Sequence, residues 1–167
     1  MAELFEKFGE FDLVEELNRA AAGQLEQGDI EALKLLAKEN GIEDDDVEDY
    51  IDGCVDELAT PMTAALGRIE VELKEIKDER ERMPCMAIAN MTKALCSDLL
   101  IAKAVMKKGK RIQRISRLMY ENRCFSGTDR ELSEIIIAYY FEDEESVKDE
   151  INQIKNRYGQ RLRLKEH

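Results

Sequence analysis

The 167-residue sequence is poor in the residues that interrupt helices or carry common chemistry. It has two prolines, no tryptophan and one histidine, which is the last residue, His167. Serine and cysteine nucleophiles need a nearby base, most often histidine, so triad-type catalysis is not expected. The phosphate-binding patterns G-x-x-x-x-G-K-[ST] and G-x-G-x-x-G are also absent. We therefore predict a protein that is not an enzyme, with no catalytic residue and no cofactor.

Metal ligands and membrane segments are equally scarce. The four cysteines form no C-x-x-C pair, whereas structural zinc needs closely grouped ligands, so no metal site is expected. The acidic run 43–52 lacks the glycine that an EF-hand loop needs at its sixth position. The start of the chain is acidic, and the apolar runs are too short to cross a bilayer. The predicted location is the cytoplasm, with reduced thiols and no membrane contact.

The residues that are abundant favour helices. Charged residues make up 37% of the chain, with many alanines, leucines, glutamates and lysines. No stretch alternates polar and apolar residues for long enough to predict a strand. The predicted fold class is all-α, with a small acidic helical bundle followed by a long helical hairpin and C-terminal helices. We place the bundle at residues 1–58 and the other helices at residues 59–167.

Local signals place the helices of the bundle within roughly residues 12–52. Asp12 and Asp29 are the predicted N-caps of the first two helices, and Glu15 would complete a capping box with Asp12. Apolar residues follow at helical spacing in each of three segments. A glycine comes after each segment as a stop signal: Gly28, Gly41 and Gly53.

The next segment predicts a long helix. Thr60 is suited to the N-cap and Pro61 to the first helical turn. Apolar residues then recur at spacings of four, three, four and three: Met62, Leu66, Ile69, Leu73 and Ile76. A second apolar seam follows, so we predict an antiparallel hairpin that turns near Met83–Pro84, with two helices of a general bundle as the alternative. Further helices are expected at 110–123, 128–141 and 146–158.

Acidic residues are concentrated near the start of the chain. Residues 1–60 hold 19 acidic and four basic residues, although the whole chain has a net charge of only -12. A solvated helix face is one interpretation of the densest run. The other is a surface that imitates nucleic-acid phosphates and enters a basic groove on a partner protein. The residues predicted to bind in that way are Glu43, Asp44, Asp45, Asp46, Glu48, Asp49 and Asp52.

Basic residues are concentrated in one later stretch, IAKAVMKKGKRIQRISR at 101–117, which contains no acidic residue. They either pair with acidic residues of the same chain or form a patch that binds phosphates or an acidic protein surface. The residues predicted to bind a partner or nucleic acid, called here the basic stripe, are Lys103, Lys107, Lys108, Lys110, Arg111, Arg114 and Arg117.

Three segments together resemble one protein family. LFEKFGEFD at 4–12, LAKENGIEDDDVEDYIDG at 36–53 and AKAVMKKGKRI at 102–112 are similar to PcfK-like proteins, small accessory proteins of phages and conjugative plasmids of Gram-positive bacteria. The resemblance covers roughly the first 115 residues. It depends on composition, and the basic element of the family departs from its pattern here at Met106 and Arg111. The family has no catalytic residues to carry over.

The resemblance implies a protein of a mobile genetic element that acts in a bacterial host cell. Small acidic helical proteins of such elements are often inhibitors of host defence, including anti-CRISPR proteins. The leading prediction is therefore a non-enzymatic inhibitor of a nucleic-acid-handling enzyme such as a CRISPR–Cas nuclease, which would be its protein partner. Two alternatives are a DNA-binding accessory factor for conjugation or replication, and a helical scaffold that forms a homodimer through the seam at 61–107.

Overall fold

The computed structural model describes residues 5–124 and 127–165 of the chain. Over these residues the protein consists of nine helices and has no strand, so the predicted all-α fold class is confirmed. In chain order the helices are α1 (Val14–Glu26), α2 (Ile30–Glu39), α3 (Asp44–Ile51), α4 (Pro61–Glu75), α5 (Glu79–Leu95), α6 (Leu99–Val105), α7 (Ile112–Glu121), α8 (Asp129–Phe141) and α9 (Glu144–Lys165).

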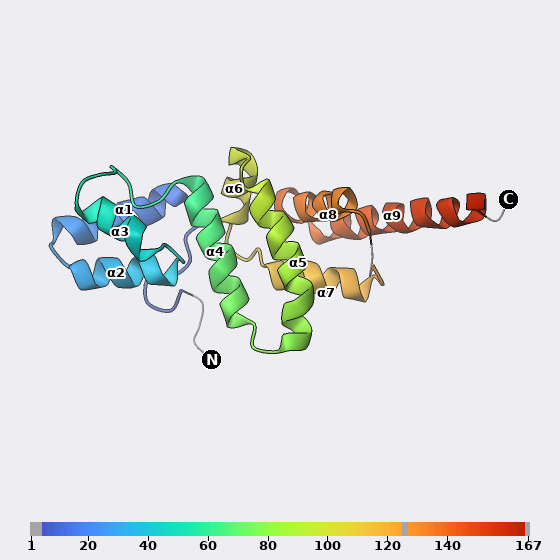
Figure 1. Ribbon diagram of the computed structural model, residues 1–167, viewed down its shortest axis with the longest axis horizontal. Helices are drawn as coiled ribbons and strands as arrows, with labels where there is room; N and C mark the ends of the chain where they lie inside the picture. The colour runs from blue at the N-terminus through green and yellow to red at the C-terminus, as the bar shows by residue number, and fades with distance from the viewer. Residues whose placement is uncertain (1–4, 125–126, 166–167) are drawn as a thin grey trace.

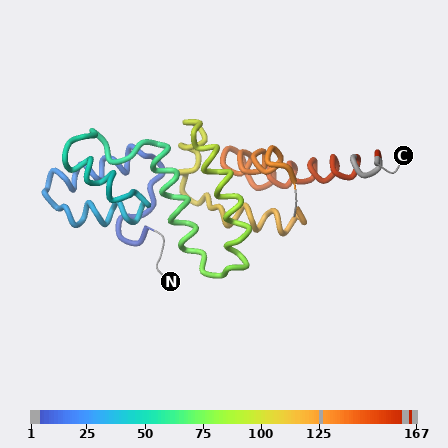
Figure 2. Tube along the Cα trace, in the orientation of Figure 1, coloured from blue at the N-terminus to red at the C-terminus, as the bar shows by residue number. Residues whose placement is uncertain are grey.

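The helices form an elongated body (Figure 1). Helices α1, α2 and α3 lie at one end, α4, α5 and α6 lie in the middle, and α7, α8 and α9 lie toward the other end. The tube in Figure 2 shows the same order, with the C-terminal part of α9 extending beyond the other helices. The first three helices and the end of α9 are therefore at opposite ends of the molecule.

Two clusters of buried apolar side chains stabilise this arrangement. The first joins α1, α2 and α3 and includes Ala64 of α4 and Met106. The second joins α4 to α9 and includes Ala65 and Ile69 of α4. Because adjacent residues of α4 belong to the two clusters, α4 lies between them and packs against both. The predicted division of the chain after residue 58 stays a prediction.

Several helix starts follow the local sequence signals. The carboxylate of Asp29 accepts the N–H of Ala32 at 3.0 Å, and the hydroxyl of Thr60 accepts the N–H of Thr63 at 3.1 Å. Thr128 and Glu131 form a reciprocal capping box at the start of α8. These side chains supply acceptors for N–H groups that have no partner within the helix.

The predicted N-cap at Asp12 is wrong. Helix α1 begins at Val14, and no side chain caps it. The carboxylate of Asp12 instead accepts the main-chain N–H of Lys108 at 2.7 Å. The Asp12 carboxylate, which the local pattern assigned to the start of α1, therefore binds a residue that is distant in the sequence.

Helices α4 and α5 pack against each other, and their arrangement as a long hairpin stays a prediction. The turn lies at residues 76–78, not at Met83–Pro84, because the Asp78 carboxylate accepts the N–H of Arg80 and starts α5 there. Pro84 lies inside α5. The second predicted long helix is also divided in two, because Asp98 caps a separate helix α6. Of the predicted seam on α4, Ile69 and Leu73 are buried, but Met62 is 45% exposed.

A close backbone contact positions the first three helices against α4. Gly41, in the turn after α2, has a φ of +69°, and it lies against Gly67 in α4. A Cβ atom on either glycine would overlap the main chain of the other segment. Glycine at both positions therefore lets the turn before α3 approach α4 more closely than any other residue would permit.

Candidate interaction surfaces

Helix α3 and the loop that follows it carry a continuous run of acidic residues. The acidic surface is defined by nine of them, which lie between residues 43 and 57 with no basic residue among them: Glu43, Asp44, Asp45, Asp46, Glu48, Asp49, Asp52, Asp56 and Glu57. Eight are exposed and Asp46 is half-buried. Val47 and Tyr50, on the opposite side of α3, are buried in the first core cluster. All seven acidic residues predicted from the sequence thus lie on one surface.

The fold holds this surface in place from both ends. The first turn of α3 contains three aspartates, which interact favourably with the positive end of the helix dipole. The loop after α3 is fixed by Asn18 of α1, whose side chain donates to the carbonyl of Ala59 at 2.8 Å and accepts its N–H at 3.0 Å. Ile42, just before this surface, and Ala59, just after it, are both buried in the first core cluster, so the acidic surface is attached to the folded body at both of its ends.

No lysine or arginine in residues 5–124 and 127–165 forms an ion pair with a carboxylate of the acidic surface. Four of the carboxylates, those of Asp46, Asp49, Asp56 and Glu57, line a hollow of about 430 Å³. The described residues contain no group of three or more potential ligands able to hold a metal ion. The carboxylates are thus spread over a surface and do not converge on one point.

The basic stripe lies elsewhere, on α6, on α7 and on the loop between them. Three of its arginines form ion pairs within the chain, but their partners are not in the acidic surface. Arg114 binds both oxygens of Glu144, at 2.6 and 3.0 Å, and this hydrogen bonding raises the pKa of Arg114 above its usual range. Arg117 pairs with Glu81 at 3.4 Å, and Arg111 pairs with Glu10 at 2.5 Å.

Lys110 also has a role in the fold. Its ammonium group donates to the carbonyls of Tyr139 at 2.7 Å and Glu142 at 3.3 Å, at the C-terminal end of α8. It also lies 4.8 Å from the centre of the Tyr139 ring. The three remaining residues of the stripe, Lys103, Lys107 and Lys108, are exposed, and within the described chain their side chains form no ion pair.

Sequence reasoning missed a cluster of four charged residues of which two, Arg68 and Glu72, are buried and two are half-buried, called here the arginine cluster: Glu10, Arg68, Glu72 and Arg111. Arg68 is 2% exposed and pairs with Glu10 and Glu72, and its Nη1 donates to the carbonyls of Met106 and Phe11. Burial lowers the pKa of Arg68 to about 10 and raises the pKa of Glu72 to about 7. The only signal in the sequence was the spacing of four between Arg68 and Glu72 beside the apolar stripe of α4.

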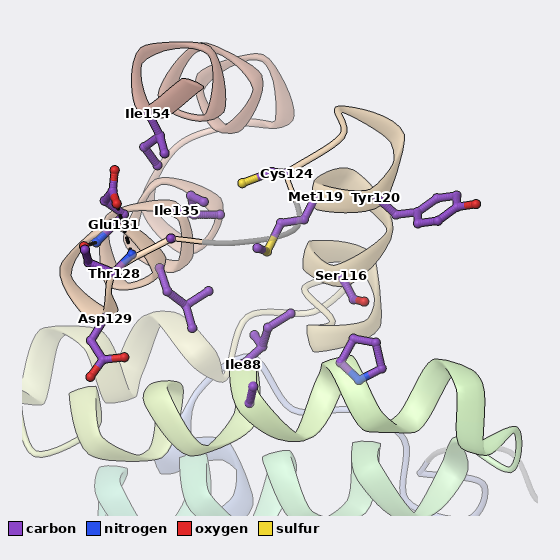
Figure 3. A pocket seen from close by; sticks show the side chains of 14 residues that line it. Ile88, Ser116, Met119, Tyr120, Cys124, Thr128, Asp129, Glu131, Ile135 and Ile154 are labelled. Atoms are coloured by element: carbon purple, nitrogen blue, oxygen red, sulfur yellow. Dashed lines mark hydrogen bonds between the residues drawn. The ribbon is translucent and has the colours of Figure 1, made fainter. Parts of the chain in front are cut away.

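An apolar cavity of about 380 Å³ lies between α5, α7, α8 and α9. Figure 3 shows Met119 and Cys124 directed toward this space, whereas the ring of Tyr120 points away from it. Burial raises the pKa of the Cys124 thiol, so this thiol is poorly reactive. No sequence pattern predicted the cavity.

No protein-family model matches this chain, and no match was found among curated proteins or solved structures. The resemblance to PcfK-like proteins stays a prediction. Within residues 5–124 and 127–165, no helix combines the length and hydrophobicity needed to cross a bilayer.

Proposed function

We propose that this protein is a non-enzymatic inhibitor, encoded by a mobile genetic element, that blocks a nucleic-acid-handling enzyme of its host. In this proposal the acidic surface enters the basic groove in which the enzyme holds nucleic acid. A CRISPR–Cas nuclease is the partner that the sequence resemblance suggests. The observation that supports the proposal most is the density of exposed acidic residues between Glu43 and Glu57, which have no ion-pair partner in the described chain.

The difference between the two charged regions favours the acidic one as the binding surface. Unpaired carboxylates have no internal ion pair to break when they meet a basic groove. Arg114 and Arg117 would first have to leave Glu144 and Glu81. A dense field of one sign also speeds the encounter with an oppositely charged groove, and this effect weakens as salt is added.

The proposal is tested by a cleavage assay with a panel of purified CRISPR–Cas nucleases. The variant Asp45→Asn/Asp49→Asn/Asp52→Asn neutralises three exposed carboxylates of the acidic surface. A matched control, Glu79→Gln/Glu142→Gln/Asp149→Asn, changes the net charge equally at exposed positions elsewhere. We expect the first variant to inhibit at least about tenfold less well than the wild type, a loss of about 1.4 kcal/mol. The control should inhibit normally.

The same assay identifies the outcomes that would contradict the proposal. Inhibition that is equal in the two variants would show that the acidic surface is not the binding surface. If no nuclease of the panel is inhibited, the CRISPR–Cas assignment is wrong. Tight binding of the wild type to free DNA, lost with added salt, would support the DNA-binding alternative.

The two alternatives have less support. A DNA-binding accessory factor would rely on the basic stripe, of which only Lys103, Lys107 and Lys108 are exposed without an ion pair in the described chain. A homodimer through the seam at 61–107 would need apolar side chains that the fold leaves uncovered. Ile69 and Leu73 of the seam are already buried in the second core cluster, so a dimer would have to use the exposed apolar residues of this range, which are Met62, Met83, Met86, Leu99 and Leu100.

A further inference from the structure

Residues 106–112, which join α6 to α7 and include the first residue of α7, donate two main-chain N–H groups to carboxylates. Gly109 has a φ of +79°, which favours glycine and lets the loop turn sharply. The N–H of Lys108 donates to the Asp12 carboxylate at 2.7 Å, and the N–H of Ile112 donates to Glu72 at 3.2 Å. This segment, called here the basic loop, therefore uses both its backbone and its side chains to bind negative charge.

Two guanidinium groups add to the positive side of this site. Arg68 from α4 and Arg111 from the basic loop both contact the same oxygen atom, Oε1 of Glu10. The Nε atom of Arg68 is buried, lies 3.6 Å from Glu72 and makes no hydrogen bond to the described residues. The arginines therefore retain donor capacity that the carboxylates of the chain do not fully use.

Two of the carboxylates that bind here come from the segment before α1. Residues 5–12, called here the N-terminal strap, lie outside the helices and place Glu10 against the two arginines and Asp12 against the basic loop. The strap is also held by the Phe5 ring, 5.5 Å from the Arg68 guanidinium, and by the N–H of Phe8, which donates to Glu39 at 3.2 Å.

We propose that Arg68, Arg111 and the main-chain N–H of Lys108 form a phosphate-binding site, and that the N-terminal strap keeps this site closed. The carboxylates of Glu10 and Asp12 occupy the positions that phosphate oxygens take when the strap moves away. A planar guanidinium group can donate two parallel hydrogen bonds to two oxygens of a phosphate, and a turn with inward N–H groups is a common anion site. The ligand is a phosphate group, either free or in a nucleic-acid backbone.

The site is close enough to solvent for an external anion to compete with the strap. The side chain of Arg111 is 32% exposed and that of Glu10 is 18% exposed, although Arg68 itself is buried. Lys107 and Lys108, in the same loop, have exposed side chains with no ion pair in the described chain. The same loop therefore carries two positive charges that no ion pair of the described chain uses.

The first experiment removes the strap's charges without removing the strap. In Glu10→Gln/Asp12→Asn the competing carboxylates become amides. The control Glu6→Gln/Glu15→Gln gives the same net charge by changing two exposed residues of the same region whose side chains form no ion pair within the part of the chain that the structure describes. Binding is measured by calorimetry with inorganic phosphate and by fluorescence anisotropy with a short single-stranded oligonucleotide, both at constant ionic strength.

We expect the first variant to bind phosphate at least about tenfold more tightly than the control, because neutral amides compete with phosphate for the arginines less strongly than carboxylates do. Adding Arg111→Gln to that variant should abolish the gain. Equal affinities in the variant and the control would overturn the proposal. A gain with the oligonucleotide as well as with inorganic phosphate assigns the site to nucleic acid, and a gain with inorganic phosphate alone assigns it to a free phosphate group.

A second experiment uses the unchanged protein, so it does not depend on the folding of a variant. Hydrogen exchange of the amides in residues 5–12 is compared in phosphate and in chloride at equal ionic strength. We expect exchange to be faster in phosphate, because a phosphate that binds the arginines displaces the strap. Unchanged exchange would overturn the proposal. Neither experiment alters the acidic surface, so the results are independent of the proposed inhibition.

Discussion

Arg68 and Glu72, one turn apart on α4, form an ion pair inside the protein, where their side chains are 2% and 6% exposed. A buried pair of this kind costs desolvation energy that its Coulomb attraction only partly offsets. Glu10 and Arg111 complete the balance of charge around it. The cluster connects the N-terminal strap, α4 and the basic loop, so changes within it should be measurable in the stability of the whole protein.

Glu72 should make the free energy of unfolding depend on pH. Burial raises its pKa to about 7 in the folded protein, against an ordinary value of 4.5, so the folded state binds more protons between these values. The contribution of Glu72 is fully present below about pH 4.5 and is lost as the pH rises through 7, with a total near 3 kcal/mol. Urea unfolding across this range should show the stability of the wild type falling relative to that of Glu72→Gln. Parallel curves for the two proteins would contradict this assignment.

Removing Arg68 alone should be strongly destabilising. Arg68→Leu leaves the buried Glu72 without its nearest cation, and breaking such a pair typically costs 3–5 kcal/mol. The double change Arg68→Leu/Glu72→Leu should recover at least half of that loss, because replacing both charges with apolar side chains leaves no buried charge unpaired. Chemical denaturation of the three proteins measures the coupling. A double variant as unstable as Arg68→Leu would show that packing, not charge, determines the loss.

Two glycines in helices should respond to alanine in opposite directions. Gly67→Ala should destabilise the protein by about 1–3 kcal/mol, because the new methyl group overlaps the main chain of Asn40 and Gly41. Gly23→Ala in α1 should stabilise it by up to about 1 kcal/mol, since no atom lies within 4 Å of the new methyl group and alanine favours a helix. Thermal unfolding of the two variants measures whether each change raises or lowers the stability of the protein. A stabilising Gly67→Ala would contradict the close approach of the two segments.

The pairing of Arg114 with Glu144 is tested by exchanging the charges. Arg114→Glu should lower the free energy of unfolding by up to about 1 kcal/mol, a modest figure because both side chains are partly exposed. Arg114→Glu/Glu144→Arg should regain most of it, whereas Lys107→Glu, at an exposed position without an ion pair in the described chain, should change little. Without such recovery, Arg114 would have no structural partner and would be available for binding.

The features that were predicted correctly from the sequence depend on residues that are close together in the chain. Thr60 and Thr128 cap their helices because each donor lies three residues ahead of the hydroxyl. The acidic surface was also predictable, because its residues are consecutive and α3 buries only one side. The role of Asp12 was not predictable, because its carboxylate accepts the N–H of Lys108. No local sequence pattern indicates a contact between residues so far apart.

The same distinction explains the basic stripe. Its composition was evident, but whether Arg111 and Arg114 are available depends on Glu10 and Glu144, which the fold brings from other segments. Burial of Arg68 was also hidden, because arginine on a helix is usually solvated and the two carbonyls that accept from it belong to distant residues.

Adjacent residues of helix α4, Ala64 and Ala65, are buried in two different core clusters. The number of residues in α4 therefore affects how the helices on its two sides are oriented. Each residue of an α-helix advances the direction of the side chains by about 100°. An insertion of a single residue between Ala64 and Ile69 would swing the first three helices around the axis of α4 and point the acidic residues of α3 to another side of the molecule. The register of this one helix thus determines the direction in which the acidic residues of α3 face.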